Sequence, residues 1–338
     1  MDPCPQRIAI TLGDAAGVGP ELVLRALADR SVRASGQMLV YGNEKLLRRV
    51  AAATALSFPP DVVVVPAHTP SASWPNDRPV IVDFPFPEVD TIVPGKVCEA
   101  CGRQAYRWIE AAVADTLAGR TQALVTGPIN KKAMHEAGYD FPGHTELLGH
   151  LTGVDHPDMI FYSPRLTLGL VTIHEALARV PQLLSAERIF QTLERACAIY
   201  QRRHTQPPRI GVLGLNPHAG EQGLFGDEEA RMIAPAVQAA RDRGYCVAGP
   251  LVPDTAFARA TGPQAALPFD VCIAMYHDQG LIPFKMLAFD EGVNVTAGLP
   301  FLRTSPDHGT AFDLAWKGIA RPTSLIQAIL LAAGRGIE

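Results

Sequence analysis

Short apolar runs alternate with longer stretches of helical periodicity along most of the chain. The runs are rich in Val, Ile and Leu, and they predict strands at residues 7–11, 37–41, 61–65, 79–83, 122–126, 166–172, 209–215 and 270–276. The intervening patterns predict helices at residues 20–34, 44–53, 98–118, 186–203, 227–243 and 322–334. Such alternation is typical of βαβ units around a mostly parallel sheet. The pattern therefore predicts an α/β fold.

Length and composition narrow this picture. The chain has 338 residues, more than one hydrophobic core usually organises, so we expect two domains with a ligand site in the cleft between them. Hydrophobic residues make up 47% and charged residues 19%, which is ordinary globular composition. The net charge of −4, without a basic run, argues against partners such as nucleic acid or a membrane surface. No apolar segment has the length of a signal peptide or a membrane span, so we expect a cytoplasmic protein.

The six cysteines are scattered, and only Cys98 and Cys101 form a CxxC motif. No second CxxC and no neighbouring His accompany it, and the surrounding residues have a helical pattern. We therefore interpret this pair as part of a helix and expect neither a zinc nor a redox role.

Three histidines follow three predicted strands in the same way: His174 in VTIHE, His218 in LNPHAGE and His277 in MYHDQG. Ligands of open α/β sheets bind just beyond the carboxyl ends of the strands. Imidazole is the commonest protein ligand of divalent transition metals, and three of them leave coordination positions open for substrate. A single histidine after a strand more often has a structural role, but three in the same position predict a catalytic metal site.

Two carboxylates lie near these histidines in sequence. Asp278 directly follows His277, where it could orient the imidazole or transfer a proton. Asp254 follows a Gly-Pro loop, and it would equally suit a helix cap or a turn. Both are candidates for the catalytic base, together with a metal-bound water.

Other polar residues suit an anionic ligand. His144 and Thr145 stand at a predicted helix start after a Pro-Gly turn, and a helix N-terminus favours a carboxylate or phosphate. Lys285, Asn294 and Arg303 can also bind anionic oxygens, Arg by bidentate pairing. The Gly-rich turn at residues 11–21 could cradle an anion or be purely structural, but it does not match the GxGxxG dinucleotide motif.

The chain closely resembles the 4-hydroxythreonine-4-phosphate dehydrogenase family of pyridoxal phosphate biosynthesis. The matching motifs run in order from ITLGDAAGVGPE through VTGPIN, FPGHTE, GLNPHAGE, GPLVPDT and MYHDQG to GVNVTAGLPFLRTSPDHGTAFDLA. The resemblance implies an isocitrate/isopropylmalate-dehydrogenase-like fold of two α/β/α domains flanking a cleft. The first domain would comprise residues 1–128 plus about 290–338 and carry the cofactor contacts. The second, about 129–289, would carry most metal and substrate ligands.

The resemblance also implies a homodimer with its active site at the subunit interface. There His174, His218 and His277 would bind one divalent metal (Zn, Co, Mn or Mg), with one histidine supplied by the opposite subunit. The substrate contacts would be His144, Thr145, Lys285, Asn294 and Arg303. The segment Asp307, His308, Gly309 and Thr310 looks like the loop that holds the adenosine part of NAD, or NADP, in isocitrate-type dehydrogenases; a helix N-terminus is the alternative interpretation.

The implied reaction is oxidation of 4-hydroxythreonine 4-phosphate at its C3 hydroxyl. The metal would lower the pKa of this hydroxyl while hydride passes to NAD. The product, 2-amino-3-oxo-4-phosphobutanoate, would decarboxylate to 3-amino-2-oxopropyl phosphate. Relatives that oxidise 4-phospho-D-threonate or 4-phospho-D-erythronate, giving dihydroxyacetone phosphate and CO2, provide the nearest alternative. A three-histidine metal hydrolase and a non-catalytic module that binds phosphorylated metabolites are the alternatives from other classes.

Overall fold

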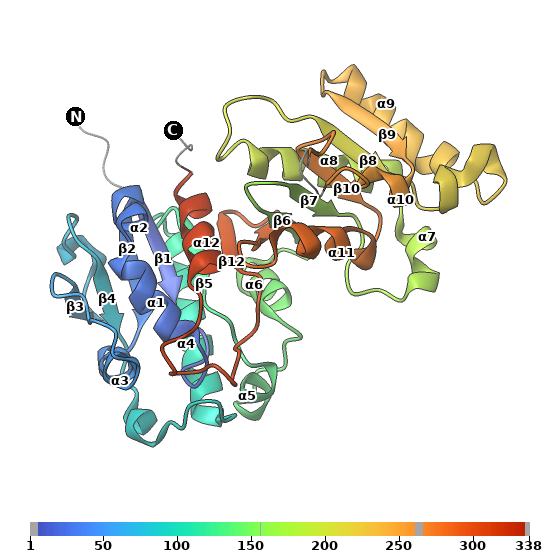
Figure 1. Cartoon of the computed structure of the whole chain (residues 1–338). Coiled ribbons are helices and arrows are strands. Elements are labelled where there is room, and N and C mark those ends of the chain that lie inside the picture. The colour runs from blue at the N-terminus through green and yellow to red at the C-terminus, as the bar shows by residue number, and fades with distance from the viewer. Residues whose placement is uncertain (1–5, 156, 261–265, 335–338) are drawn as a thin grey trace. The chain divides into compact units, whose positions relative to one another are not determined.

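The computed structural model describes residues 6–155, 157–260 and 266–334, and the chain divides into two compact units. The first unit is formed by Met1–Pro157 with Gly298–Arg335, and the second is built on Asp158–Ala297. In each unit helices cover the strands (Figure 1), which confirms the predicted α/β class. The assignment of cofactor contacts to one domain and substrate contacts to the other stays a prediction.

The sheet of the first unit is parallel in every pairing that the structure describes. Its strand order is β3-β4-β2-β1-β5-β12. The strands are β1 (Arg7–Thr11), β2 (Gln37–Gly42), β3 (Val63–Pro66), β4 (Val80–Asp83), β5 (Ala123–Thr126) and β12 (Leu302–Pro306). Strand β12 follows the second unit in the sequence, and it pairs with β5 of the first unit.

Helices cover both faces of this sheet (Figure 1). One face carries α1 (Gly19–Ala28), α2 (Arg30–Ser35) and α12 (Thr323–Ala333), and the other carries α4 (Glu99–Leu117). The unit also contains α3 (Glu44–Thr54), α5 (Lys131–Glu136) and α6 (His144–Thr152). The single helix predicted at residues 20–34 is wrong, because Asp29 interrupts it: its carboxylate accepts the Ser31 and Val32 amides and caps α2.

The second unit has a mixed sheet of order β11-β6-β7-β10-β8-β9. Its strands are β6 (Asp158–Tyr162), β7 (Thr167–Leu170), β8 (Ile210–Leu213), β9 (Val247–Leu251), β10 (Val271–Ala274) and β11 (Val293–Ala297). Strand β6 runs antiparallel to both β7 and β11, whereas β7, β10, β8 and β9 are parallel. The sequence pattern did not predict β6, β9, β11 or β12, because polar residues, Gly or Pro break their apolar runs.

The helices of the second unit also lie on both faces of its sheet. Helices α8 (Ala186–Tyr200) and α9 (Ala234–Asp242) pack together, and α11 (His277–Ala288) packs on β7 and β10. Short helical segments complete it at α7 (Val180–Leu183), α10 (Pro253–Ala256), η4 (Pro217–Gly223) and η5 (Glu229–Ile233). Across the described residues, no helix is both long and apolar enough to cross a membrane.

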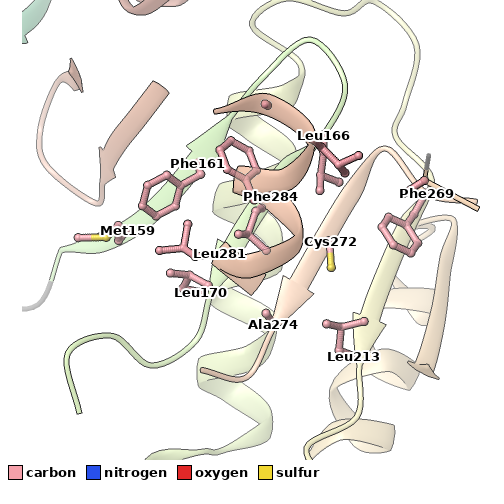
Figure 2. Close-up of a cluster of buried hydrophobic side chains, with 14 residues drawn as sticks. Met159, Phe161, Leu166, Leu170, Leu213, Phe269, Cys272, Ala274, Leu281 and Phe284 are labelled. Atoms are coloured by element: carbon pink, nitrogen blue, oxygen red, sulfur yellow. The ribbon is translucent and has the colours of Figure 1, made fainter. Parts of the chain in front are cut away.

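An apolar core fixes α11 on the sheet (Figure 2). Leu281 and Phe284 of this helix are buried against Phe161 and Leu170 of the strands. The Phe161 and Phe284 rings lie 5.6 Å apart between centroids. Burying such side chains contributes about 1.5–3 kcal/mol each. This core therefore holds the first residue of α11, His277, at a defined edge of the sheet.

Candidate functional site

The three histidines follow the carboxyl ends of three adjacent, parallel strands. His174 comes four residues after β7, His277 three residues after β10 and His218 five residues after β8. In the sheet β10 lies between β7 and β8. Because parallel strands end at one edge, the three segments emerge together, where open α/β sheets bind ligands. His277 is the first residue of α11 rather than a strand residue.

His174 and His277 are brought close to each other. Their ring centroids lie 5.8 Å apart, and both residues line a cavity of about 340 Å³ that is also lined by Leu177, Val180 and Tyr276. The His277 Nδ1 lies 2.7 Å from the Asp278 Oδ1. A carboxylate on Nδ1 fixes the imidazole tautomer and leaves Nε2 with its lone pair facing outward. Asp278 is thus in position to orient His277.

His218 stands in a loop of unusual backbone conformation. Every residue from His218 to Gln222 has a positive φ, and His174 does too (φ 47°). Non-glycine residues rarely adopt this region, and such strain persists where the surroundings fix it, often at functional sites. Here the Glu229 carboxylate accepts the Leu215 and Asn216 amides at 2.8 and 2.7 Å, which anchors the start of the loop.

The donor chemistry of these residues fits a divalent metal. His174 and His218 are exposed and His277 is partly so, which leaves ring nitrogens accessible to an ion. Within the described part of one chain, however, no three His, Cys, Asp or Glu side chains converge closely enough to hold an ion. The structure brings together His174 and His277, and His218 is beside Phe225, with centroids 6.3 Å apart.

The other predicted residues of the second unit are dispersed over three elements. Asp254 is exposed on α10, and Lys285 is half-buried on α11. Asn294 lies on β11, and its buried Oδ1 accepts no hydrogen bond from the residues that the structure describes. A buried amide oxygen without a donor costs free energy, so this atom is suited to a ligand that donates to it.

A buried polar group lies in the first unit around Arg303 of β12. Its side chain is 2% exposed, and Nε and Nη2 donate to the Thr126 Oγ1 at 3.1 and 2.6 Å. Burial lowers the pKa of Arg303 to about 9, because an apolar surrounding disfavours the cation. An anion bound against the guanidinium would stabilise the charged form.

The charge of Arg303 also affects His144. Burial, and then the charge of Arg303, hold the pKa of His144 well below its ordinary range, so the ring is neutral at pH 7. Its Nε2 is buried and has no hydrogen-bond partner among the described residues. Thr145 follows it in the first turn of α6, whose N-cap residue Gly143 offers no side-chain cap. Three of the five predicted substrate residues thus come from the first unit, and two of them interact.

The segment from Asp307 to Thr310 follows β12 and does not form a helix. The Thr310 carbonyl accepts the Val18 amide at 3.0 Å, and a Cβ on Gly17 would approach the Thr310 side chain to 3.1 Å. The Gly-rich turn and this segment are therefore packed directly on each other. Gly17 permits that approach because it has no side chain.

Three further polar residues of these segments were not predicted from the sequence: Thr126, Glu229 and Asp14. Thr126 and Arg303 are 177 residues apart, and no spacing rule links them. Asp14 stands in the Gly-rich turn, 1% exposed. Burial raises its pKa to about 7. A carboxylate inside a Gly-rich turn was the signal that could have identified it.

Comparison with known proteins gives one consistent result. The family model described as pyridoxal phosphate biosynthetic protein PdxA matches residues 34–332. A 4-hydroxythreonine-4-phosphate dehydrogenase of Trichlorobacter lovleyi is 44% identical over 332 residues, covering 98% of this chain and 97% of the relative. A D-threonate 4-phosphate dehydrogenase of Pectobacterium atrosepticum is 42% identical over 326 residues, covering 96% and 98%.

A solved structure is similarly close. The crystal structure of 4-hydroxythreonine-4-phosphate dehydrogenase from Klebsiella pneumoniae is 41% identical and superposes with a TM-score of 0.80, covering 99% of each chain. The sequence match and the fold match thus span nearly the whole molecule and agree on one family. The chain belongs to the pyridoxal phosphate biosynthetic protein PdxA family, a family of dehydrogenases.

Proposed function

We propose that this chain is an NAD-dependent and divalent-metal-dependent dehydrogenase that oxidises the C3 hydroxyl of 4-hydroxythreonine 4-phosphate. The product, 2-amino-3-oxo-4-phosphobutanoate, then loses CO2 to give 3-amino-2-oxopropyl phosphate. The observation that carries the proposal is the buried Arg303 beside the neutral His144, because a buried guanidinium binds an anionic oxygen more strongly than an exposed one does. The names of the similar relatives supply the substrate class.

Arg303, His144 and Thr145 would bind anionic oxygens of the substrate. A guanidinium binds phosphate or carboxylate through two parallel hydrogen bonds, and these bonds are stronger in a buried site. A neutral imidazole can donate from one nitrogen without adding a second positive charge beside Arg303. Lys285 and Asn294 would supply the remaining contacts, the latter through its buried Oδ1.

His174, His218 and His277 would hold the divalent metal. When bound, such an ion acts as a Lewis acid that lowers the pKa of a hydroxyl and polarises the neighbouring ketone. Asp278 would keep His277 in the ligating tautomer through its 2.7 Å contact with Nδ1. That role leaves Asp254 as the better candidate for a base, since it is exposed and, within the described part of the chain, it orients no histidine.

NAD, or NADP, would accept the hydride. The Asp307–Thr310 segment would contact the cofactor, supported by its packing on the Gly-rich turn at Val18. Backbone amides of such a turn, at the start of α1, are suited to approach a phosphate group. Asp307, His308 and Gly309 are partly or fully exposed and thus accessible.

A homodimer would complete the metal site. The helix that begins with His277 presents Ile282, Met286 and Phe289 at 61, 75 and 71% exposure. These residues recur at helical spacing, so they share one exposed apolar stripe, which is typical of a protein interface. In such a dimer a second copy would cover this stripe and supply one of the three histidines of each metal site.

The second candidate substrate differs by one functional group. A D-threonate 4-phosphate dehydrogenase of Cupriavidus necator is 44% identical to this chain, the same identity as the hydroxythreonine relative. 4-Phospho-D-threonate or 4-phospho-D-erythronate would then be oxidised to dihydroxyacetone phosphate and CO2. The test compares kcat/KM for the three phosphorylated acids with NAD and with NADP. Faster turnover of 4-hydroxythreonine 4-phosphate supports the proposal, and equal or faster turnover of the hydroxy acids contradicts it.

A further inference from the structure

Gln279 is a side chain of α11 that joins two of the histidine-bearing segments. It is the third residue of this helix, two positions after His277, and it is half-buried. Its Oε1 accepts the Met275 amide at 2.7 Å, and its Nε2 donates to the Gly214 carbonyl at 2.6 Å. Met275 directly follows β10, and Gly214 directly follows β8. One amide group therefore bridges the segments from which His277 and His218 extend.

The segment of the third histidine is tied to the same strand end. Thr172 is buried between β7 and His174, and both its Oγ1 and its amide donate to the Met275 carbonyl, at 2.7 and 3.2 Å. Met275 thus binds the β7 segment through its carbonyl and Gln279 through its amide. All three segments are joined by hydrogen bonds beyond the last paired residues of the strands.

Packing fixes the helix that carries Gln279. A Cβ on the next residue, Gly280, would lie 2.7 Å from the Leu168 side chain on β7 and 2.9 Å from the Ala274 Cβ on β10. A glycine permits this close approach of helix and sheet because it has no side chain. The buried Phe284 lies one turn farther along the helix, in the core that holds it on the sheet. The Gln279 amide is thus presented to the strand ends from a fixed support.

The other end of the bridge, Gly214, lies close to the His218 loop. A Cβ on Gly214 would lie 2.9 Å from the Cα of Ala219, the residue after His218, so the loop folds back onto this glycine. Gln279 holds the Gly214 carbonyl, and Glu229 accepts the amides of the next two residues. A shift of Gly214 would therefore move the backbone that carries His218.

Capping of α11 does not account for both hydrogen bonds of Gln279. In a capping box, the side chain at the third helical position accepts the amide of the N-cap residue. The bond from Met275 resembles this arrangement, because Met275 directly precedes the N-cap residue Tyr276. Gly214, however, is 65 residues away in the sequence, and its carbonyl is no part of the helix end. The second bond connects the helix to the loop of His218 instead.

We propose that Gln279 is a positioning residue of the metal site, whose amide keeps the His277 and His218 segments in the arrangement that binds a divalent ion. This role rests on the proposed metal-dependent dehydrogenase function. Residues that orient metal ligands without touching the ion typically contribute a factor of about 10 to 100 to metal affinity. The bridge fixes the segment from which each histidine extends, so Gln279 contributes whether the two histidines bind one ion or the sites of two subunits.

The test measures Co²⁺ binding by the full chain after a chelator has removed all metal. Imidazole nitrogens bind such ions, and competition with a coloured chelator gives the Kd. Gln279→Met keeps the length of the side chain but loses both hydrogen bonds. We expect it to raise the Kd about 10- to 100-fold and to change the visible absorption spectrum of bound Co²⁺. Gln238→Met is the matched control, since Gln238 is exposed on α9 of the same unit and donates only to Asp242, one turn away; it should leave the Kd unchanged.

A second variant tests the role of Gln279 if Gln279→Met does not fold. Gln279→Asn retains an amide but is one methylene shorter, so its amide falls short of Met275 and Gly214. It should also raise the Kd at least about tenfold. Circular dichroism and urea unfolding of the metal-free chain report the fold of each variant.

The Kd separates a positioning role from a purely structural one. A structural residue would lower the free energy of unfolding and leave the Co²⁺ affinity of the folded chain unchanged. A Kd within about threefold of the wild type in either folded variant therefore overturns the role of Gln279, while the metal site stands. If the wild type binds no Co²⁺ that His277→Ala abolishes, the proposed metal site is wrong, and the role of Gln279 falls with it.

Discussion

Replacing Arg303 and its hydroxyl partner together should separate ligand binding from stability. The guanidinium is 2% exposed and donates twice to Thr126, so the double variant Arg303→Met, Thr126→Val removes donor and acceptor at once. Replacing buried ionic groups by apolar side chains of similar volume is often neutral or stabilising by about 1–4 kcal/mol. We therefore expect a free energy of unfolding at least equal to that of the wild type.

Catalysis should respond in the opposite direction. Removing a desolvated charge that binds an anionic ligand costs about 2–5 kcal/mol. This corresponds to a fall in kcat/KM of about 30-fold to several thousand-fold. NADH absorbance measures the rate, and urea unfolding measures stability. Arg209→Met is the control: this arginine is 55% exposed, pairs with Asp270, and precedes β8 at the end opposite His218.

Two results would refute the reasoning about Arg303. A kcat/KM within about threefold of the wild type would mean that the buried cation does not bind substrate. A variant destabilised by more than about 2 kcal/mol would mean that the arginine is retained for the fold.

Three further predictions concern residues around the two candidate sites. Burial raises the pKa of Asp14 from 3.8 to about 7, so between these pH values the folded chain keeps a proton that the unfolded chain releases. The free energy of unfolding therefore falls as the pH rises through that window, by up to about 4 kcal/mol. Urea unfolding of Asp14→Asn should not show this pH dependence, and a dependence equal to that of the wild type would contradict the burial argument. Asp278→Asn should raise the metal concentration for half-maximal NADH formation about 10- to 100-fold, and an unchanged metal dependence would exclude the orienting role. Glu229→Ala leaves the Leu215 and Asn216 amides without their acceptor and should lower the free energy of unfolding, measured in urea, by about 2–3 kcal/mol. The control Glu228→Ala loses one side-chain contact to Asn216 and should lower it by less. Equal losses would argue against Glu229 as the anchor of the loop.

The sequence pattern predicted the fold class, and it predicted that His174, His218 and His277 follow strands at one edge of the sheet, for a simple physical reason. Strands β7, β8 and β10 are buried on both faces, so they are continuous apolar runs, and the residues that follow them must emerge at one edge. The same rule failed for β12, where Arg303, Thr304 and Ser305 are buried polar residues. Their burial depends on partners such as Thr126, which only the folded chain supplies.

Local geometry was less accessible from sequence. Nothing in the spacing of His174 and His218 indicates that both adopt a positive φ. Likewise, no spacing rule links the Gly-rich turn to the segment before α4, although the Ala16 carbonyl accepts the Gly95 amide at 2.8 Å. Contacts of high sequence separation are specified by packing, and periodicity carries no information about them.

The central claim is that hydride passes from a phosphorylated hydroxy acid to NAD in a metal-dependent reaction. The most direct measurement follows 4-hydroxythreonine 4-phosphate and NADH together after the chain is mixed with substrate and a divalent metal, with and without NAD. The account predicts one NADH formed for each substrate consumed, no consumption without NAD, and no NADH after the metal is removed by a chelator. Substrate consumed at the same rate without NAD would contradict it and indicate a hydrolase.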